Sequence, residues 1–408
     1  MIRLNRSRQE NDMIAVPYGM TVHGEEEIDA VVEVLRTSTQ MGRNVREFER
    51  KNAELFGKKH GLMVNSGSSA LEIAVELLNL PEGSEVITPV LTFSTTVSCI
   101  LRNRLVPVYV DVVPGTYVID VDSIEAKITE KTAAVVIPNL VGNIPDWEKI
   151  DDVCKKHGLL MVEDSADTLG GTLNGKPSGH WSDISITSFY GSHVINCAGN
   201  GGLLSVNRDE WAERGKLLRS WGRSSSLFVD SEAIENRFNV DLDGIPYDAK
   251  FVFSDVGHNF EPSELGAAFG LVQLSKLDDN IKAREWAFAQ QAVYFSKYAD
   301  WFELPVQTPG TRTGWLAFPL TVKPQAPFSR RELQIFLEKN NVQTRVVFTG
   351  NILRQPGFKN KPGVGNASDF PNADSVMRGG ILMACHHGLT EQMLTYVHEC
   401  FDEFANQF

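Results

Sequence analysis

Short apolar runs alternate with amphipathic segments over the first half of the chain. Between residues 61 and 207 the runs read GLMV, EVITPV, LVPVYVDV, AAVVIPNL, LLMVEDSA, ISITSFY and GGLLSVN. Such runs are typical of strands buried on both faces, and the amphipathic segments between them are typical of helices. The pattern predicts an α/β domain whose mostly parallel, seven-stranded sheet is covered by helices.

Two helices are predicted ahead of this region. Acidic residues open the segment EEEIDAVVEVLRTS, and its apolar residues recur at helical spacing. These apolar positions are Ile28, Val31, Val32 and Leu35. A second helix is expected from Val45 to Phe56.

The pattern changes after Pro262. A long helical stretch is predicted from Glu264 to Tyr298, and beyond it the strand candidates WLAFPLTV and QTRVVF flank a helix at RRELQIFLEKN. These elements indicate a smaller α+β domain. We therefore predict an N-terminal arm over residues 1–23, a large domain over 24–285 and a small C-terminal domain over 286–408.

Composition and charge narrow the class of protein. The 408 residues are 42% hydrophobic and 22% charged, and 39 Lys+Arg against 52 Asp+Glu give a net charge of −13. This balance argues against a chain-wide surface for nucleic acid or anionic membrane. The N-terminus has no apolar signal segment and no run is long enough to span a membrane, so we expect a cytoplasmic protein. Five scattered cysteines without a CxxC pair favour reduced thiols, and no metal site is predicted.

Small and acidic residues follow several predicted strands. Gly67, Ser68 and Ser69 open a helix directly after a strand, which is a suitable place for an anion, although plain helix capping explains them equally well. Asp164 and Asp167 lie at the carboxyl end of the strand LLMVED, the edge where open α/β sheets bind ligands. A carboxylate there can hold a pyridinium nitrogen protonated, and the alternative is a helix cap.

Several other candidate residues indicate a functional site only when they are considered together. Phe93 follows another strand end and can stack on a flat cofactor, although core packing explains an isolated Phe. His193, in SFYGSH after Ser188, can move a proton near neutral pH, because its unperturbed pKa is about 6.5. The remaining candidates are polar residues that would otherwise be surface or capping residues: Asn259, Asn351, Arg219, Arg223 and Arg345. Guanidinium groups suit a diphosphate or a carboxylate.

In their order, these motifs resemble the sugar aminotransferase family, which contains pyridoxal 5′-phosphate (PLP) enzymes of the aspartate-aminotransferase fold, fold type I. The shared motifs are Met41-Gly42, the SGS turn, FSTT, NLVGN, SFY…H, FEPSELGAAFGLVQL and FTGN, and the resemblance extends from about Val16 to Leu382. It implies that Gly67, Ser68, Ser69 and Ser188 bind the cofactor phosphate. Phe93 would stack on the ring, Asp164 would pair with the pyridine nitrogen, and Asp167 would lie near the ring hydroxyl. Asn259 would reach the phosphate of a neighbouring subunit in a homodimer with shared active sites.

The histidine points to one branch of the family. Where most members have a lysine, this chain has His193, as do the 3-dehydratases that make 3,6-dideoxysugars for O-antigen lipopolysaccharide. An imidazole does not form the stable covalent bond that a lysine amine makes with the cofactor aldehyde, so we expect the cofactor to bind non-covalently as PLP or pyridoxamine 5′-phosphate. We hypothesise a lyase. Glutamate would supply the amino group, His193 would act as acid and base, and the C3 hydroxyl of a GDP- or CDP-linked 4-keto-6-deoxyhexose would leave.

A related type of dehydratase carries an iron–sulfur cluster. Here Ser224-Ser225-Ser226-Leu227 and Ala166 occupy the places where its cysteines are expected, so we predict no cluster. The histidine segment also departs from the family, because Asn200 replaces the acid usual before the paired glycines. Three alternatives stay open: an aminotransferase, an epimerase or isomerase, and a non-catalytic protein that binds the cofactor or a sugar.

Overall fold

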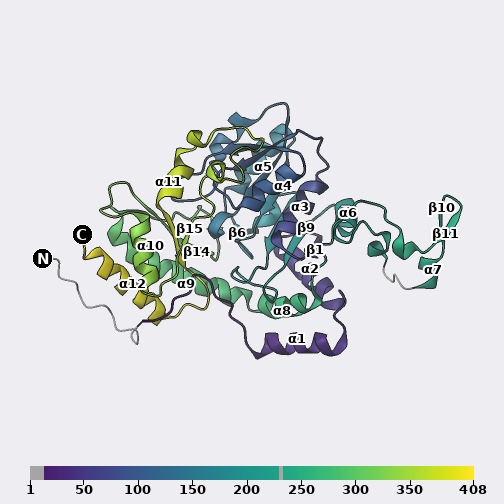
Figure 1. Cartoon of the computed structure of the whole chain (residues 1–408), viewed down its shortest axis with the longest axis horizontal. Coiled ribbons are helices and arrows are strands. Elements are labelled where there is room, and N and C mark those ends of the chain that lie inside the picture. Colours follow the sequence, from purple (N-terminus) through teal and green to yellow (C-terminus); the bar gives the residue numbers. More distant parts are fainter. Residues whose placement is uncertain (1–12, 229–232) are drawn as a thin grey trace.

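A computed structural model describes residues 13–228 and 233–408. Most of the predicted N-terminal arm, residues 1–12, lies outside the described residues. The described chain forms a large domain around a central sheet and a smaller sheet domain. A projecting arm, which we define as residues 221–228 and 233–258, extends from the large domain (Figure 1).

Seven strands of the described chain form the central sheet. Their order across the sheet is β1 (His60–Val64), β9 (Gly202–Val206), β8 (Ile184–Ser188), β5 (Leu160–Asp164), β4 (Thr132–Pro138), β2 (Glu85–Pro89) and β3 (Val106–Val110). Strand β9 runs antiparallel to both of its neighbours, whereas the other pairings are parallel. The predicted mostly parallel, seven-stranded sheet is therefore confirmed.

Helices cover both faces of this sheet because alternate strand residues point to opposite sides. Val136 and Val162 pack with one set of helices, α3 (Gly67–Leu77), α4 (Ser94–Arg102) and α6 (Asp209–Arg219). Their neighbours Val135 and Met161 pack on the other side with α5 (Trp147–His157). Helices α2 (Arg43–Leu55) and α8 (Glu264–Ser275) cover the part of that side next to β1 and β9.

The small domain is built on a four-stranded antiparallel sheet. Its order is β12 (Phe302–Glu303), β14 (Ala317–Val322), β16 (Gly380–Ala384) and β15 (Arg345–Val346). Helices α10 (Arg330–Lys339), α11 (Pro371–Gly379) and α12 (Glu391–Ala405) accompany it. The remaining short strands of the large domain are β6 (Thr172–Leu173) and β7 (Lys176–Pro177), which pair with each other, while β6 also pairs with β13 (Thr311–Arg312).

The predicted long helical stretch consists of two helices. Helix α8 ends at Ser275, Lys276 serves as its cap, and α9 (Leu277–Phe295) begins at the next residue. The side chain of Lys276 bonds to Glu27 Oε1 at 2.9 Å, which ties this break to the N-terminal helix. The predicted domain boundary near residue 285 falls inside α9 and stays a prediction.

The first predicted helix is present as α1 (Glu25–Thr37), but not all of its apolar positions face the core. Ile28 is exposed and Leu35 is 62% exposed, whereas Glu27 and Val34 face the core. The carboxylate of Glu27 accepts hydrogen bonds from Gly24 N and Gln273 Nε2, at 2.9 and 2.8 Å. Because these bonds and the ion pair with Lys276 satisfy a buried charge, they turn the helix so that its apolar stripe faces outward.

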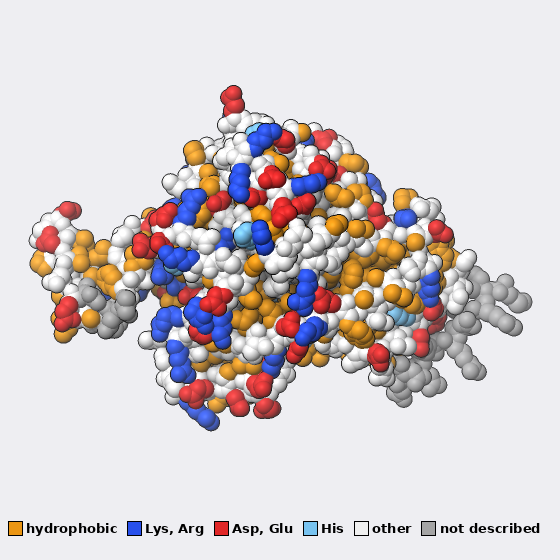
Figure 2. Space-filling view, turned by 180° about the vertical axis from the view of Figure 1, so that it is seen from behind, with side chains coloured by type: hydrophobic (Ala, Val, Ile, Leu, Met, Phe, Trp, Pro, Cys, Tyr) orange, Lys and Arg blue, Asp and Glu red, His pale blue; other side chains and the backbone are white. Residues whose placement is uncertain are grey.

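The projecting arm contains η6 (Ser224–Leu227), α7 (Ile234–Arg237), β10 (Val240–Leu242), β11 (Ile245–Tyr247) and η7 (Ala249–Phe251). Its exposed apolar side chains include Trp221, Leu227, Ile234, Phe238, Ile245, Phe251, Phe253 and Val256. Figure 2 shows hydrophobic side chains gathered along this arm. So much apolar surface on a thin projection is typical of a protein contact.

Candidate active site

The carboxyl ends of the parallel strands bring the predicted residues to one edge of the sheet. The turn after β1 meets the end of β8 there. A Cβ atom added to Gly67 would lie 2.6 Å from the Cβ of Ser188, and one added to Gly202 would lie 2.4 Å from Gly67 N. The glycines therefore permit backbone and side chains to approach closely, as a phosphate-binding turn requires.

The turn itself opens helix α3. Ser66 is the N-cap and accepts a hydrogen bond from Ser69 N at 3.1 Å, while Ser69 Oγ donates to Asn65 Oδ1 at 2.6 Å. Ser66 is thus the residue that caps the helix, and the role of the Ser69 side chain toward a phosphate stays a prediction. The N–H groups of Gly67 and Ser68 precede the first intrahelical bond, which runs from Ala70 N to Ser66 O. They can still bind an anion at the positive end of the helix.

Two buried acids lie at the end of β5 and just after it, at the same edge of the sheet. Asp164 accepts hydrogen bonds from Thr96 Oγ1 at 2.8 Å and Ala166 N at 3.1 Å, and Asp167 accepts one from Val141 N at 2.8 Å. Burial raises the pKa of Asp164 to about 6 and that of Asp167 to about 7, against these hydrogen bonds. Each acid is therefore ready for a ligand whose positive charge or hydrogen bond compensates for burial.

Phe93 presents an aromatic ring at the same edge. It precedes α4 and is 48% exposed, and its ring lies 6.0 Å from that of Phe348 in an edge-to-face arrangement. The core-packing alternative does not describe so exposed a ring. Thr96, one turn along the same helix, bonds to Asp164, so this helix start joins the aromatic ring to the buried acid.

His193 lies in the loop that follows β8. Its backbone N–H donates to Tyr190 O at 2.9 Å, and its ring lies 5.8 Å from the Tyr190 ring. Within the described residues, Nδ1 is buried and has no hydrogen-bond partner. Burial lowers the pKa of His193 to about 4. The charge of Arg284 also lowers this pKa, whereas hydrogen bonding with the backbone of Ser188 and Ala166 raises it. The imidazole is therefore neutral near pH 7 and can accept a proton.

Sequence reasoning missed two residues beside this loop, Tyr18 and Arg284. The hydroxyl of Tyr18 is buried and has no partner in the part of the chain that the structure describes. Arg345 lies over its ring, 5.3 Å from the centroid, and burial followed by the charge of Asp167 raises its pKa. The position of Tyr18 depends on a distant contact, because Val16, two residues before it, pairs with Val342 of the small domain. No local sequence pattern therefore indicates where Tyr18 lies.

Two of the polar candidates have structural partners. Arg219 is buried and forms an ion pair with Glu49 at 2.7 Å. Asn351 is also buried, and its amide donates to Ala367 O and Asp374 Oδ1, both at 2.9 Å. These contacts describe a core ion pair and a capping side chain, and a role in substrate binding for either residue stays a prediction.

Two further polar candidates, Arg223 and Asn259, lie on or beside the projecting arm, whereas Arg345 lies over the Tyr18 ring. The guanidinium of Arg223 stacks on the Trp221 ring at 4.7 Å. Asn259 is exposed at the end of the arm, where the chain re-enters the large domain and its backbone pairs with Ser220. Within the described residues, neither side chain forms a hydrogen bond with the loop of His193, and the role of Asn259 toward a neighbouring subunit stays a prediction.

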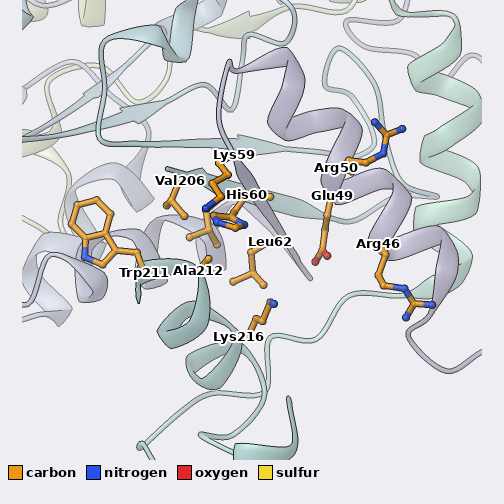
Figure 3. A pocket seen from close by; sticks show the side chains of 12 residues that line it. Arg46, Glu49, Arg50, Lys59, His60, Leu62, Val206, Trp211, Ala212 and Lys216 are labelled. Carbon is orange, nitrogen blue, oxygen red and sulfur yellow. The ribbon is translucent and has the colours of Figure 1, made fainter. Parts of the chain in front are cut away.

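A separate pocket opens at the opposite edge of the sheet. It has a volume of about 200 Å³ and is lined by Arg46, Lys59, His60, Trp211 and Lys216, among others (Figure 3). His60 begins β1 and Val206 ends the antiparallel β9, so this pocket lies a strand length away from Gly67. Several of its charges are paired internally, as Lys59 is with Asp209 at 2.5 Å.

The candidate site suits a flat ligand that carries a phosphate. The helix start with its close-packed glycine can bind the phosphate, Phe93 offers a stacking surface, and the two acids and His193, which follow neighbouring strands at the same edge of the sheet, offer groups that hold or move protons. Over residues 13–228 and 233–408, no group of three or more His, Cys, Asp or Glu side chains is arranged to hold a metal ion. No helix in the same ranges has the length and apolarity to cross a membrane.

Comparison with known proteins gives matches over nearly the whole chain. Residues 21–402 match the model of the DegT/DnrJ/EryC1/StrS aminotransferase family. The chain is 35% identical over 403 residues to dTDP-4-dehydro-2,6-dideoxy-D-glucose 3-dehydratase of Saccharopolyspora spinosa, covering 95% of this chain and 86% of that protein. It is 34% identical to the lipopolysaccharide biosynthesis protein RfbH of Salmonella typhimurium, covering 95% and 91%.

A solved structure with the same fold carries a cofactor. The E. coli GDP-4-keto-6-deoxy-D-mannose-3-dehydratase with bound hydrated PLP matches with a TM-score of 0.85 and 25% identity, covering 95% of this chain and 99% of that one. The expected PLP fold type I architecture and the resemblance to the histidine-bearing dehydratases are thereby confirmed.

Proposed function

Because this chain belongs to the DegT/DnrJ/EryC1/StrS aminotransferase family, we propose that it is a PLP-dependent 3-dehydratase of a nucleotide-linked 4-keto-6-deoxyhexose. One observation carries the proposal. The loop after Ser188 offers the imidazole of His193, whose Nδ1 is buried and has no hydrogen-bond partner among the described residues, where family members that transfer amines have a lysine. An imidazole retains proton transfer and lacks the primary amine.

The residues of the site would hold the cofactor as follows. The N–H groups of Gly67 and Ser68, with the hydroxyl of Ser188, would bind its phosphate, and Ser69 would support the turn through Asn65. Phe93 would cover one face of the ring. Asp164 would hold the pyridine nitrogen protonated, and the bond from Thr96 favours the ionised carboxylate that this requires. Asp167 would lie toward the ring hydroxyl.

When bound, the cofactor supplies an amino group and a pyridinium ring that withdraws electrons from the carbons next to that group. His193 does the proton work. Because its pKa is lowered to about 4, its ring is neutral at neutral pH and has a free lone pair that can take a proton, and the resulting imidazolium is a strong acid that can protonate the departing C3 oxygen of the sugar.

The names of the relatives support a sugar nucleotide and leave the base open. One relative is named for a dTDP-linked sugar, and the matched solved structure for a GDP-linked one, so dTDP joins GDP and CDP as a nucleotide to be tested. The similarity to RfbH supports a role in making a deoxysugar for lipopolysaccharide. We propose glutamate as the amino donor and the cytoplasm as the location.

We also propose that the protein acts as a homodimer. The exposed apolar side chains of the projecting arm and of α1, such as Phe253 and Leu35, would be covered by a second copy (Figure 2). Asn259 lies at the end of that arm, from which it would reach the phosphate site of the partner.

The test is incubation of the protein with PLP, glutamate and each 4-keto-6-deoxyhexose linked to GDP, CDP or dTDP. A dehydratase gives a sugar that has lost one oxygen atom, together with one 2-oxoglutarate and one ammonia per sugar. H193N should retain the fold and lose this turnover, whereas H193K should retain the cofactor through dialysis and yield an amino sugar. An amino sugar from the wild type would instead indicate an aminotransferase, unchanged mass with altered stereochemistry an epimerase, and no turnover a binding protein.

A further inference from the structure

Arg284 is a buried cation in helix α9 and is 1% exposed. Its guanidinium donates only to neutral acceptors: Asn280 Oδ1 at 2.8 Å, Trp315 O at 3.1 Å, Leu316 O at 3.2 Å, Cys385 O at 3.4 Å and His193 O at 3.5 Å. In the described ranges, no carboxylate forms an ion pair with it. Burial of an unpaired charge costs several kcal/mol, so a structural tether would be served better by a neutral donor.

Helix α9 holds the loop of His193 at two successive carbonyl groups. Arg284 approaches His193 O, and Asn280 Nδ2 donates to Val194 O at 2.5 Å. Asn280 and Arg284 are also bonded to each other, one helical turn apart. The two side chains therefore fix the backbone that carries the imidazole.

The same guanidinium fixes the small domain against this loop. Trp315 and Leu316 lie just before β14, and Cys385 follows β16, so their carbonyl groups mark the ends of two paired strands. Gly314 allows this approach, because a Cβ atom added there would lie 3.2 Å from Arg284 Cδ. Arg284 is thus the point at which the His193 loop and the small sheet meet.

The charge of Arg284 also acts on nearby imidazoles. Burial lowers the pKa of His193, His386 and His387 to about 4, and Arg284 contributes to the shift of all three. Around His193, the Ser188 and Ala166 backbone acts in the opposite direction, Tyr190 presents its ring, and Arg284 is the charged side chain that contributes. Arg284 itself remains charged at neutral pH, because burial lowers its pKa only to about 10.

We propose that Arg284 is a positioning residue for His193, which fixes the base loop against the small domain and whose unpaired charge keeps the imidazole free of a proton. This role rests on the proposed function of His193 as the base. A residue that serves only as a tether between domains would affect stability and leave the protonation of His193 unchanged.

The test compares R284Q, which removes the charge, with R284K, which retains it but loses the planar set of donors. The titration midpoint of His193 is read from the imidazole ¹⁵N signals, assigned by their loss in H193N, on the protein with and without PLP. In R284Q the midpoint should rise by about one pH unit, whereas in R284K it should stay within a few tenths of the wild-type value. Both variants should lower the unfolding temperature, because both lose carbonyl contacts.

Activity gives a second measurement if the protein is a dehydratase. The acid limb of kcat/KM should move with the His193 midpoint in R284Q, and R284K should restore it. An unchanged midpoint in R284Q, or equal shifts in both variants, overturns the proposal. The titration requires no sugar, so its outcome is separate from failure of the dehydratase assay.

R284Q could lose the fold because five contacts depend on the guanidinium. In that case N280D decides, since it sets a carboxylate beside Arg284 Nε and offsets the charge while the arginine stays in place. An upward shift of the His193 midpoint in folded N280D supports the proposal, and an unchanged midpoint overturns it.

Discussion

Gly67 and Ser188 are in close contact at the carboxyl edge of the sheet, and a Cβ atom on Gly67 would lie 2.6 Å from the Ser188 Cβ. The contact joins the start of helix α3 to the end of β8, which lie far apart in the sequence. This close approach supports the proposal that the helix start binds an anion together with Ser188.

Substitution G67A should therefore disrupt this cradle. The added methyl group must displace Ser188, which should lower the free energy of unfolding by about 1–3 kcal/mol and weaken PLP binding at least about tenfold. Absorbance titration with PLP and urea unfolding measure the two effects. G357A is the matched control, because no atom lies within 4 Å of a Cβ at that glycine. Unchanged PLP affinity in G67A would show that the cofactor phosphate binds elsewhere.

The ion pair of Arg219 should matter for stability rather than for substrate. Its guanidinium is bonded to Glu49 and to Met63 O at 2.9 Å, and R219Q would leave a largely buried carboxylate without its partner. The expected loss is about 3 kcal/mol in the free energy of unfolding. R223Q is the comparison, because stacking on Trp221 contributes about 1 kcal/mol or less. If R219Q folds with near wild-type stability and loses only substrate affinity, Arg219 binds substrate instead of stabilising the fold.

Purified protein should contain no iron–sulfur cluster. The five cysteines are free and buried, and serines occupy the loop at residues 224–227. A cluster requires thiolate ligands that this loop does not offer. Iron and labile-sulfide analysis after anaerobic purification, and again after incubation with iron and sulfide, should give only the buffer background. Stoichiometric iron with sulfide would mean that the electron transfer of the cluster-bearing dehydratases is retained.

The sequence predicted the elements of the fold and the residues that follow strand ends. Local hydrophobic periodicity is enough to locate strands such as Leu160–Asp164, and the residue after a buried strand must lie at the sheet edge, as Asp164 does. Glu27 shows where this reasoning fails. A charged residue interrupts the apolar stripe, so only the distant Gln273 and Lys276 reveal that the helix turns its acid inward.

The same limit applies to the residues that support His193. Tyr18 lies in a stretch without periodicity, and its place depends on contacts such as that of its N–H with Gln343 Oε1 at 3.2 Å. Arg284 lies on the buried face of α9, together with Asn280 and Ala287. Their helical spacing was the feature of the sequence that could have placed Arg284 in the core. A buried arginine at a helical core position contradicts ordinary amphipathic patterning, so it marks a functional or structural junction.

Acidification should destabilise the protein partly through His193. Its pKa is about 4 in the folded protein, where burial is the first cause of the shift, against 6.5 in the unfolded chain. Between these values the unfolded chain binds a proton at this position that the folded chain does not, so stability from this group is present above pH 6.5 and is lost as the pH falls toward 4. H193N removes this dependence. The quantity to measure is the difference in free energy of unfolding, H193N minus wild type, without PLP. This difference should be about 1 kcal/mol larger at about pH 5.5 than at about pH 7.5. Urea unfolding followed by tryptophan fluorescence measures the gap, with H180N, at an exposed histidine, as the matched control. A gap that is the same at both pH values would mean that His193 titrates in the folded protein as it does in the unfolded chain, so that burial does not lower its pKa.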